Sequence, residues 1–268
     1  MKIGIIGCGA VGQKLSKNIQ KFLSDEIEIY AICDVDQTRA NEVARSLEKS
    51  PKVYQDYKQL IKDVDFVIEV ATGDVVPDIL YHVTKMGKKL MVLSVGGLLK
   101  VPDISKLIQE SDSNLYVPSG AIAGLDGFAA LKHADIRQVT LTTRKPPKGL
   151  KGAPFLQKKS INLDLIQEET CVFEGTAFEA VEAFPKNANV AATISLAGIG
   201  PDKTKVCILT DPKWTCNSHE IEVISDAGRM VMFTENHPDP DNPKTSYIVT
   251  LSALALLEKF FEGIKIGV

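Results

Sequence analysis

The chain has 268 residues, which is enough for two modest domains or one large domain. Hydrophobic residues make up 44% and charged residues 24%, an ordinary globular mixture, and the net charge of −3 argues against nucleic acid or an anionic membrane as a partner. No apolar run approaches the roughly 18 residues that span a bilayer, and an apolar strand follows Met1 directly, so we expect a cytoplasmic protein without a signal peptide.

The five cysteines are odd in number and scattered, and no two of them form a CxxC pair. This pattern indicates neither a disulfide framework nor a zinc site, so we expect no metal.

The first dozen residues carry the clearest motif. An apolar run ends in Gly7-x-Gly9-x-x-Gly12, and a helical pattern follows at once. Such a strand, tight turn and helix N-terminus form the phosphate-binding part of a dinucleotide-binding unit. Gly7 would allow the turn, Gly9 would let a pyrophosphate approach the backbone, and Gly12 would let the helix pack closely on the sheet. The helix N-terminus, at Ala10 and Val11, would offer N–H groups to the phosphates.

A second strand ends at Asp34, about 20 residues after the last glycine, where an acidic residue should meet the ribose hydroxyls of the adenosine. Asp34 favours NAD because a carboxylate repels a 2′-phosphate. Arg39 lies close enough in the sequence to leave NADP open. The alternative is a glycine-rich turn that binds no ligand, but strand, spacing, helix and acid all agree with the nucleotide interpretation.

Strands and helices alternate through residues 1–118, which predicts an open, doubly wound parallel sheet of the Rossmann type. After the first strand, further strands are expected at 27–32, around Val53, and at 66–71, 90–95 and 115–117. Helices are expected from Val11 to Leu23, at 37–50, 57–62 and 75–86, and around 104–108. Because ligands bind beyond the carboxyl ends of such strands, the segments expected to share one rim are 7–12, 71–73, 94–97 and 118–120. Ala71 on this rim is therefore a further candidate for cofactor contact.

The pattern changes after Pro118. Strands are expected at 136–144, 170–174, 205–210, 219–224 and 230–235, with helices at 128–133, 177–184 and 189–196. Many strands with few helices between them predict an antiparallel or mixed sheet, hence a second α+β domain over residues 119–243 that binds substrate. The tail, 244–268, reads as a long helix that packs back on the first domain. Its expected stripe is Tyr247, Leu251, Leu254 and Phe261.

His219 is the histidine best suited to chemistry. It follows a polar turn and is expected to open a strand of the second domain, and a histidine that titrates near neutrality is a natural proton shuttle for an amine or imine. A hydrogen-bonded structural histidine is the alternative. The other three histidines are expected in surface, capping or solvated positions: His82, His133 and His237.

Three polar segments could hold an anionic substrate, because each brings a cation, an amide or hydroxyls to a helix start or a proline-fixed turn. They are 144–147, 184–189 and 242–246. Capped, solvated loops are the alternative for each segment.

The chain resembles the L-aspartate dehydrogenase family in five segments: 118–127, 144–147, 184–192, 217–221 and 242–246. With the N-terminal glycines they span nearly the whole chain. The resemblance implies a Rossmann domain followed by an α+β domain, and a homodimer that forms largely through the second domain. It also implies oxidation of L-aspartate to iminoaspartate, which can feed NAD biosynthesis or hydrolyse to oxaloacetate and ammonia.

The resemblance also implies roles for individual residues. His219 takes the position of the catalytic histidine, and Ala123 and Asn189 take the positions of residues that contact the dinucleotide. As cations and hydroxyls for the two substrate carboxylates, we expect Arg144, Lys244, Thr245 and Ser246. One small departure is Val70-Ala71-Thr72, where the family pattern has Ala-Ala-Ser.

Two other functions stay open at this point. One is a related Rossmann reductase for another small amino acid or dicarboxylate, such as a relative of homoserine dehydrogenase or dihydrodipicolinate reductase. The other is a non-catalytic sensor that binds NAD and uses its second domain to dimerise or to recruit a partner.

Overall fold

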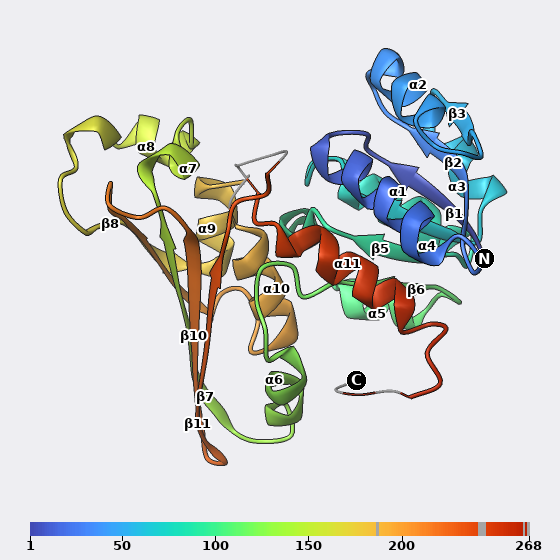
Figure 1. Ribbon diagram of the computed structural model, residues 1–268. Helices are drawn as coiled ribbons and strands as arrows, with labels where there is room; N and C mark the ends of the chain where they lie inside the picture. The colour runs from blue at the N-terminus through green and yellow to red at the C-terminus, as the bar shows by residue number, and fades with distance from the viewer. Residues whose placement is uncertain (186–187, 241–244, 265, 267–268) are drawn as a thin grey trace. The chain divides into compact units, whose positions relative to one another are not determined.

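The computed structural model describes residues 1–185, 188–240, 245–264 and 266. Contacts between residues divide the chain into a first unit, Met1–Pro118 with Thr250–Ile264, and a second unit formed mainly by Ser119–Val249. Each unit is built on one sheet (Figure 1). None of the helices in the described ranges is long and apolar enough to cross a membrane.

The first unit contains a six-stranded parallel sheet in the order β3-β2-β1-β4-β5-β6. Its strands are β1 (Lys2–Ile6), β2 (Glu28–Cys33), β3 (Lys52–Tyr54), β4 (Phe66–Glu69), β5 (Lys89–Val92) and β6 (Asn114–Tyr116). The predicted doubly wound sheet is confirmed. The direction of winding reverses between β1 and β4, and such a switch point is where these sheets bind ligands beyond the carboxyl ends of the strands.

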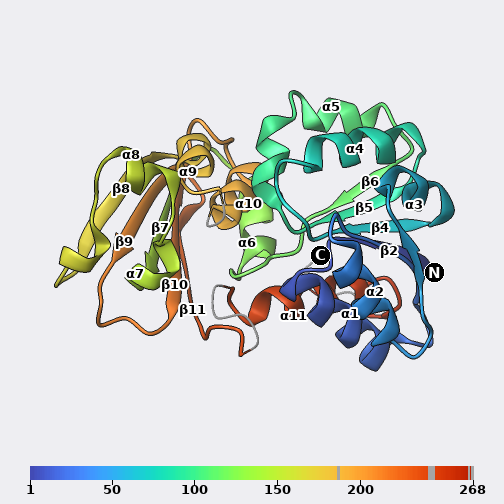
Figure 2. The same cartoon turned by 90° about the horizontal axis from the view of Figure 1, so that it is seen from above.

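Helices cover both faces of this sheet (Figure 2). One face carries α1 (Ala10–Leu23) and α2 (Gln37–Arg45), and the other carries α3 (Tyr57–Asp63), α4 (Val76–Lys85) and α5 (Ile104–Gln109). Helix α1 buries Leu15, Ile19 and Leu23 at helical spacing, whereas Phe22 is 52% exposed. Strand β5 ends at Val92, whereas the sequence predicted a strand that continues to Val95, and a short 3₁₀ helix, η1 (Val95–Lys100), follows.

The C-terminal helix α11 (Ile248–Glu258) belongs to the first unit from Thr250 onward. Just after it, the Phe260 ring packs edge-on against Phe66 and Tyr116, with ring centroids 5.6 and 5.0 Å apart. The predicted apolar stripe is wrong apart from Leu254. The face that the helix actually buries consists of Thr250, Ala253, Leu254 and Leu257. The other predicted members of the stripe are 38–41% exposed: Tyr247, Leu251 and Phe261.

The second unit contains a five-stranded mixed sheet in the order β11-β10-β7-β9-β8, which confirms the predicted sheet type. Its strands are β7 (Ile136–Lys145), β8 (Thr170–Thr176), β9 (Lys205–Thr210), β10 (Asn217–Ser225) and β11 (Gly228–Asn236). Strands β7 and β9 are parallel, and the other neighbours are antiparallel.

Three helices lie along one face of this sheet: α6 (Leu125–Leu131), α9 (Ala177–Ala183) and α10 (Asn189–Ala197) (Figures 1 and 2). Alternate residues of the central strands are buried, as the period of a strand with one covered face requires. They are Val139, Leu141, Val206, Ile208, Ile221 and Val223. The connection from β7 to β8 contains α7 (Pro147–Leu150), α8 (Pro154–Lys158) and a 3₁₀ turn, η2 (Leu163–Leu165).

Candidate functional site

The three glycines of the first turn meet different steric demands. Gly7 has φ of +109°, and a Cβ there would lie 2.6 Å from the backbone of Val70. A Cβ on Gly12 would lie 2.1 Å from the Gly7 carbonyl oxygen. Gly9 differs, because a Cβ there would meet nothing within 4 Å. The protein itself therefore requires glycine at positions 7 and 12, whereas the space over Gly9 is open to a ligand.

This turn leads directly into α1, whose N-cap is Gly9 and has no side-chain cap. Ala10, the first helical residue, is exposed, and Val11 is partly buried. An uncapped helix start below an open glycine suits a phosphate, because backbone N–H groups and the helix dipole both favour an anion. The residues present fit the pyrophosphate of a dinucleotide.

Asp34 lies just past the end of β2, where the sequence predicts the ribose-binding acid, and it is 8% exposed. Its carboxylate accepts hydrogen bonds from the backbone N–H groups of Cys8 at 2.6 Å and Asp36 at 2.8 Å. The Arg39 guanidinium lies 3.8 Å from Asp34 and 3.0 Å from Asp36, with 43% of the side chain exposed. A fixed carboxylate, Asp34, and an exposed guanidinium, Arg39, thus lie close together after β2.

A buried carboxylate that the sequence analysis did not single out joins two loops of the rim. Glu69, at the end of β4, accepts hydrogen bonds from the backbone N–H of Ala71 at 2.7 Å and of Ser94 at 3.0 Å. Its side chain is fully buried, and burial raises the pKa of Glu69 to about 7. Ala71 itself is exposed, beyond the carboxyl end of β4.

His219 is the third residue of β10 rather than its first, because the strand begins at Asn217. It is 2% exposed, and it lies opposite Thr143 of β7 in the antiparallel register. The hydroxyl of Thr143 is 3.0 Å from His219 Nδ1. Since Nδ1 has this partner, Nε2 is the nitrogen that remains for a reacting group.

Burial lowers the pKa of His219 to about 3, and the positive charge of Lys145 lowers it in the same direction. The imidazole is therefore neutral at physiological pH, but its pKa lies well below the value near neutrality that the sequence analysis expects of a proton shuttle.

The cation on the His219 face of the sheet is Lys145 and not Arg144. Side chains alternate along a strand, so Lys145 points to the same face as Thr143, and burial lowers the pKa of Lys145 to about 8. Arg144 points to the opposite face, where its guanidinium is 3.0 Å from the Glu220 carboxylate. Arg144, expected as a cation for the substrate carboxylates, therefore does not lie on the same face of the sheet as His219. The alternation of Val139, Leu141, Thr143 and Lys145 in the sequence could have shown it.

The loop that carries Ala123 is tied to the strand beside His219. The Ala121 carbonyl accepts hydrogen bonds from the Thr234 hydroxyl at 2.9 Å and the Asn236 side-chain amide at 2.8 Å. Thr234 lies opposite His219 in the pairing of β10 with β11. Ala123, two residues farther along the loop, is exposed.

For the other predicted site residues of the second unit, the structure gives contacts with residues other than His219. Asn189 begins α10 and is partly buried, and its carbonyl accepts a hydrogen bond from Thr193. Ser246 is buried, and its hydroxyl accepts a hydrogen bond of 3.3 Å from the Asn217 side chain in the strand of His219. The Thr245 carbonyl accepts from the Asp239 N–H at 2.7 Å. Lys244 lies outside the described residues.

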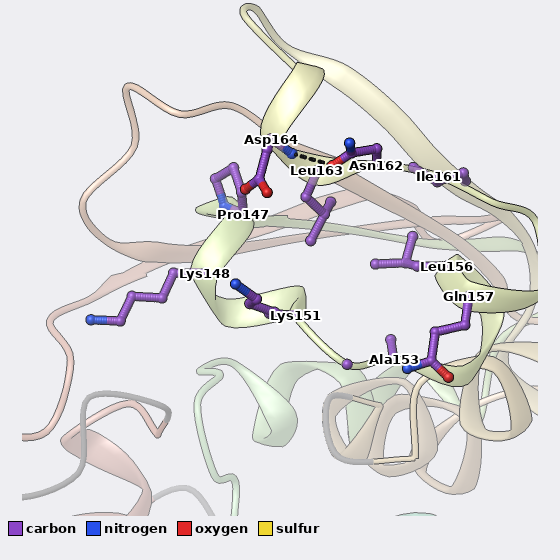
Figure 3. Close-up of a pocket in the computed structure, with 11 residues that line it drawn as sticks. Pro147, Lys148, Lys151, Ala153, Leu156, Gln157, Ile161, Asn162, Leu163 and Asp164 are labelled. Carbon is purple, nitrogen blue, oxygen red and sulfur yellow. Dashed lines mark hydrogen bonds between the residues drawn. The ribbon is translucent and has the colours of Figure 1, made fainter.

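A hollow of about 310 Å³ lies elsewhere in the second unit, among α7, α8 and η2 (Figure 3). Its lining includes Leu156, Leu163 and Lys151, and Lys148 points away from the other lining side chains. None of the predicted site residues lines it. Across the described ranges, no three His, Cys, Asp or Glu side chains are grouped so that they could hold a metal ion.

Comparisons with known proteins cover both units. A family model described as "Aspartate dehydrogenase, C-terminal" matches residues 126–260, and one described as "Homoserine dehydrogenase, NAD binding domain" matches residues 7–118. The L-aspartate dehydrogenase of Methanosarcina mazei is 44% identical over 100% of this chain and 99% of the relative. That of Methanosarcina barkeri is 43% identical with the same coverage.

Among solved structures, the crystal structure of aspartate dehydrogenase from Thermotoga maritima matches with a TM-score of 0.75 and 27% identity, covering 99% of each chain. A putative myo-inositol dehydrogenase from Sinorhizobium meliloti, at 15% identity and a TM-score of 0.52, shares the fold alone. The homoserine dehydrogenase model covers only residues 7–118, whereas the two Methanosarcina relatives match the whole chain and are both named L-aspartate dehydrogenase.

Proposed function

The chain belongs to the L-aspartate dehydrogenase family, and on this premise we propose that it catalyses the NAD(P)-dependent oxidation of L-aspartate, with a pyridine nucleotide held at the Gly7–Gly12 turn and His219 as the catalytic base. The reaction converts L-aspartate and NAD(P)⁺ into iminoaspartate, NAD(P)H and a proton. Water then turns the imine into oxaloacetate and ammonia. The observation that carries the proposal is a buried, neutral imidazole with Nδ1 already engaged, in a chain that matches this family from end to end.

When bound, a pyridine nucleotide would supply the electron acceptor, a nicotinamide ring able to accept a hydride from the α-carbon of the substrate. The chain contributes the turn around Gly9 that would hold the pyrophosphate. The open space over Gly9 supports the binding of a dinucleotide there. Gly7 and Gly12 shape the turn, Ala10 and Val11 begin the helix below the phosphates, and contacts from Ala71, Ala123 and Asn189 belong to the same proposal.

His219 accepts a proton from the substrate amine at Nε2 and later helps water to add to the imine. A base must be unprotonated to do this, and burial keeps His219 in that form. Thr143 fixes the ring orientation through Nδ1. Ser246 and Thr245, with Lys244, remain proposed contacts for the substrate carboxylates.

We propose NAD as the preferred cofactor and NADP as a poorer one. The Asp34 carboxylate is fixed by two backbone N–H groups and disfavours a 2′-phosphate there. The exposed Arg39 guanidinium offers that phosphate a partial counter-charge. Arg39→Gln should lower kcat/KM for NADP while that for NAD stays within about fivefold, since exposed charges contribute little otherwise. An equal loss for both cofactors would remove Arg39 from this role.

The resemblance also supports a homodimer formed through the second unit. We assign its contact to the sheet face opposite α9 and α10. On that face β11 exposes Val231 by 46% and Phe233 by 57%, while Met232 points to the buried side.

The test of the activity is NAD(P)H formation with L-aspartate against D-aspartate, L-glutamate and L-homoserine. L-Aspartate should be the best substrate, and His219→Ala should lower its turnover about 10²–10⁴-fold while the fold is retained. A preference for L-homoserine or L-glutamate would replace the proposed substrate. No NAD(P)H with any amino acid, despite dinucleotide binding, would leave only a nucleotide-binding protein.

A further inference from the structure

Lys145 and Thr210, on neighbouring strands of the second unit, lie on the same sheet face as His219. We propose that these two side chains form the subsite that holds a carboxylate of the dicarboxylate substrate. The inference rests on the proposed function and adds to it the residues that recognise the second acidic group. Neither residue was singled out as a binding residue from the sequence.

The strand register places them together. Lys145 of β7 lies opposite Thr210 of β9 in the parallel pairing. Two residues earlier on β7, Thr143 lies opposite His219 of β10 and contacts its ring. Because side chains two residues apart on a strand share a face, all four side chains lie on one side of the sheet.

Lys145 is an unusual residue for this position. Its side chain is 8% exposed, whereas lysine is almost never fully buried in folded proteins. A carboxylate that arrives next to this ammonium forms a charge-assisted hydrogen bond, which is stronger than a hydrogen bond between neutral groups. A buried cation beside a proposed catalytic base is thus well suited to recognise an acidic substrate.

Thr210 supplies the independent observation. Its residue is fully buried, and its hydroxyl finds no hydrogen-bond partner among the described residues. Buried hydroxyls are normally paired, because an unpaired one costs about 1–3 kcal/mol. A hydroxyl directly opposite Lys145 can donate to the same carboxylate oxygen or to its neighbour.

Helix α7 packs close to Lys145. A Cβ on Gly149 of α7 would lie 3.8 Å from Lys145 Cβ and 3.9 Å from Asn217 Oδ1, so the α7 backbone closes over these two side chains. Asn217 in turn donates to Ser246. The Asn217 amide therefore lies close to the same α7 residue as the Lys145 side chain.

The experiment measures substrate and inhibitor binding in Lys145→Met. KM for L-aspartate and the dissociation constant of succinate, measured by calorimetry on the NADH-bound enzyme, should both rise about tenfold to a hundredfold with one charged hydrogen bond lost. The NADH dissociation constant should not change. Arg144→Met removes the neighbouring cation on the opposite face and is the matched control, for which both values should stay near wild type.

Thr210→Val gives a second test, because it replaces the unpaired hydroxyl with a methyl group of the same shape. Thermal stability should be unchanged or higher, while KM and the succinate dissociation constant rise about threefold to tenfold. Thr210→Ser, which keeps the hydroxyl, should bind succinate more tightly than Thr210→Val.

Succinate binding distinguishes a failure of the proposed subsite from a failure of the proposed activity. If the wild type oxidises L-aspartate but folded Lys145→Met binds succinate as the wild type does, the subsite is overturned and the function stands. If the wild type binds succinate through Lys145 but does not oxidise L-aspartate, the function is overturned and the subsite stands. Weaker succinate binding in Arg144→Met but not in Lys145→Met would also overturn the subsite.

Discussion

The neutral, buried state of His219 has a consequence for stability in acid. The imidazole has a pKa of about 3 in the folded protein and near 6.5 when unfolded, so the unfolded chain binds more protons between these values. Its contribution to stability is complete above pH 6.5 and is lost progressively as the pH falls toward 3. The loss amounts to about 1.4 kcal/mol per pH unit once the pH is well below 6.5.

We therefore expect His219→Gln to lose less stability than the wild type between pH 7.5 and 5.5, by about 1 kcal/mol. Urea unfolding at both pH values measures the difference. The comparison within each protein across pH removes the cost of the substitution itself. An identical loss in both proteins would mean that His219 is not held neutral.

Thr143 should act through His219 and not on the substrate. Thr143→Val removes the hydroxyl at Nδ1 and should lower kcat by about tenfold to a hundredfold, since the ring loses its fixed orientation, with a smaller change in KM. Thr143→Ser restores the hydroxyl and should recover most of the rate. The pH profile of kcat should also shift in Thr143→Val alone. Equal losses in both variants would indicate a packing role.

The buried faces of β7 and β10 could have been predicted from the sequence. His219, Ile221 and Val223 alternate with polar residues, as do Leu141, Thr143 and Lys145, so the buried face of each strand was legible. The pairing of these strands could not be predicted in the same way. The opposition of Thr143 to His219 joins residues 76 positions apart, and no local pattern specifies such a register.

At the scale of elements, two glycines of the first turn have different roles: Gly12 is needed for packing, whereas Gly9 is proposed to leave room for the ligand. Gly12→Ala should destabilise the protein by about 1–3 kcal/mol, because its Cβ would overlap the Gly7 carbonyl. Gly9→Ala should change stability by less than about 0.5 kcal/mol but weaken NADH binding at least about tenfold, a penalty of about 1.4 kcal/mol.

Thermal melts and fluorescence titration with NADH distinguish the two glycines. Unchanged NADH affinity in Gly9→Ala would place the pyrophosphate elsewhere.

Helix α11 shows where the apolar pattern gives too little information. Its sequence is hydrophobic on almost every side, so several stripes fit the same residues equally well. The choice is made by packing on the first unit, which buries Leu257 and leaves Leu251 38% exposed. The amphipathic helix α1, by contrast, could be placed from sequence to within one residue at its start.

At the scale of the whole molecule, the proposed dimer makes a direct prediction. Phe233→Glu places a charge on the outer face of the second sheet and should convert a dimer into a monomer, because a buried unpaired carboxylate costs several kcal/mol. Light scattering after size-exclusion chromatography measures the mass. Phe22→Glu, on an exposed part of α1, is the matched control. A dimer that survives Phe233→Glu would move the contact to another surface.

The two sheets differ in how far the sequence predicts them. The motif at the first turn determines a parallel sheet with its known strand order, because βαβ crossovers are short and right-handed. The second sheet, in the order β11-β10-β7-β9-β8, pairs strands far apart in the chain, and only its mixed character followed from the alternation of elements.

Glu69 makes the rim of the first unit sensitive to acidity in its own right. One carboxylate accepts hydrogen bonds from both loops, and with a pKa of about 7 it exchanges its proton in the range where cells keep their pH. Protonation of either carboxylate oxygen weakens the hydrogen bond that this oxygen accepts from its loop. We therefore expect dinucleotide affinity to decline on mild acidification even when no amino acid is bound, independently of the chemistry at His219.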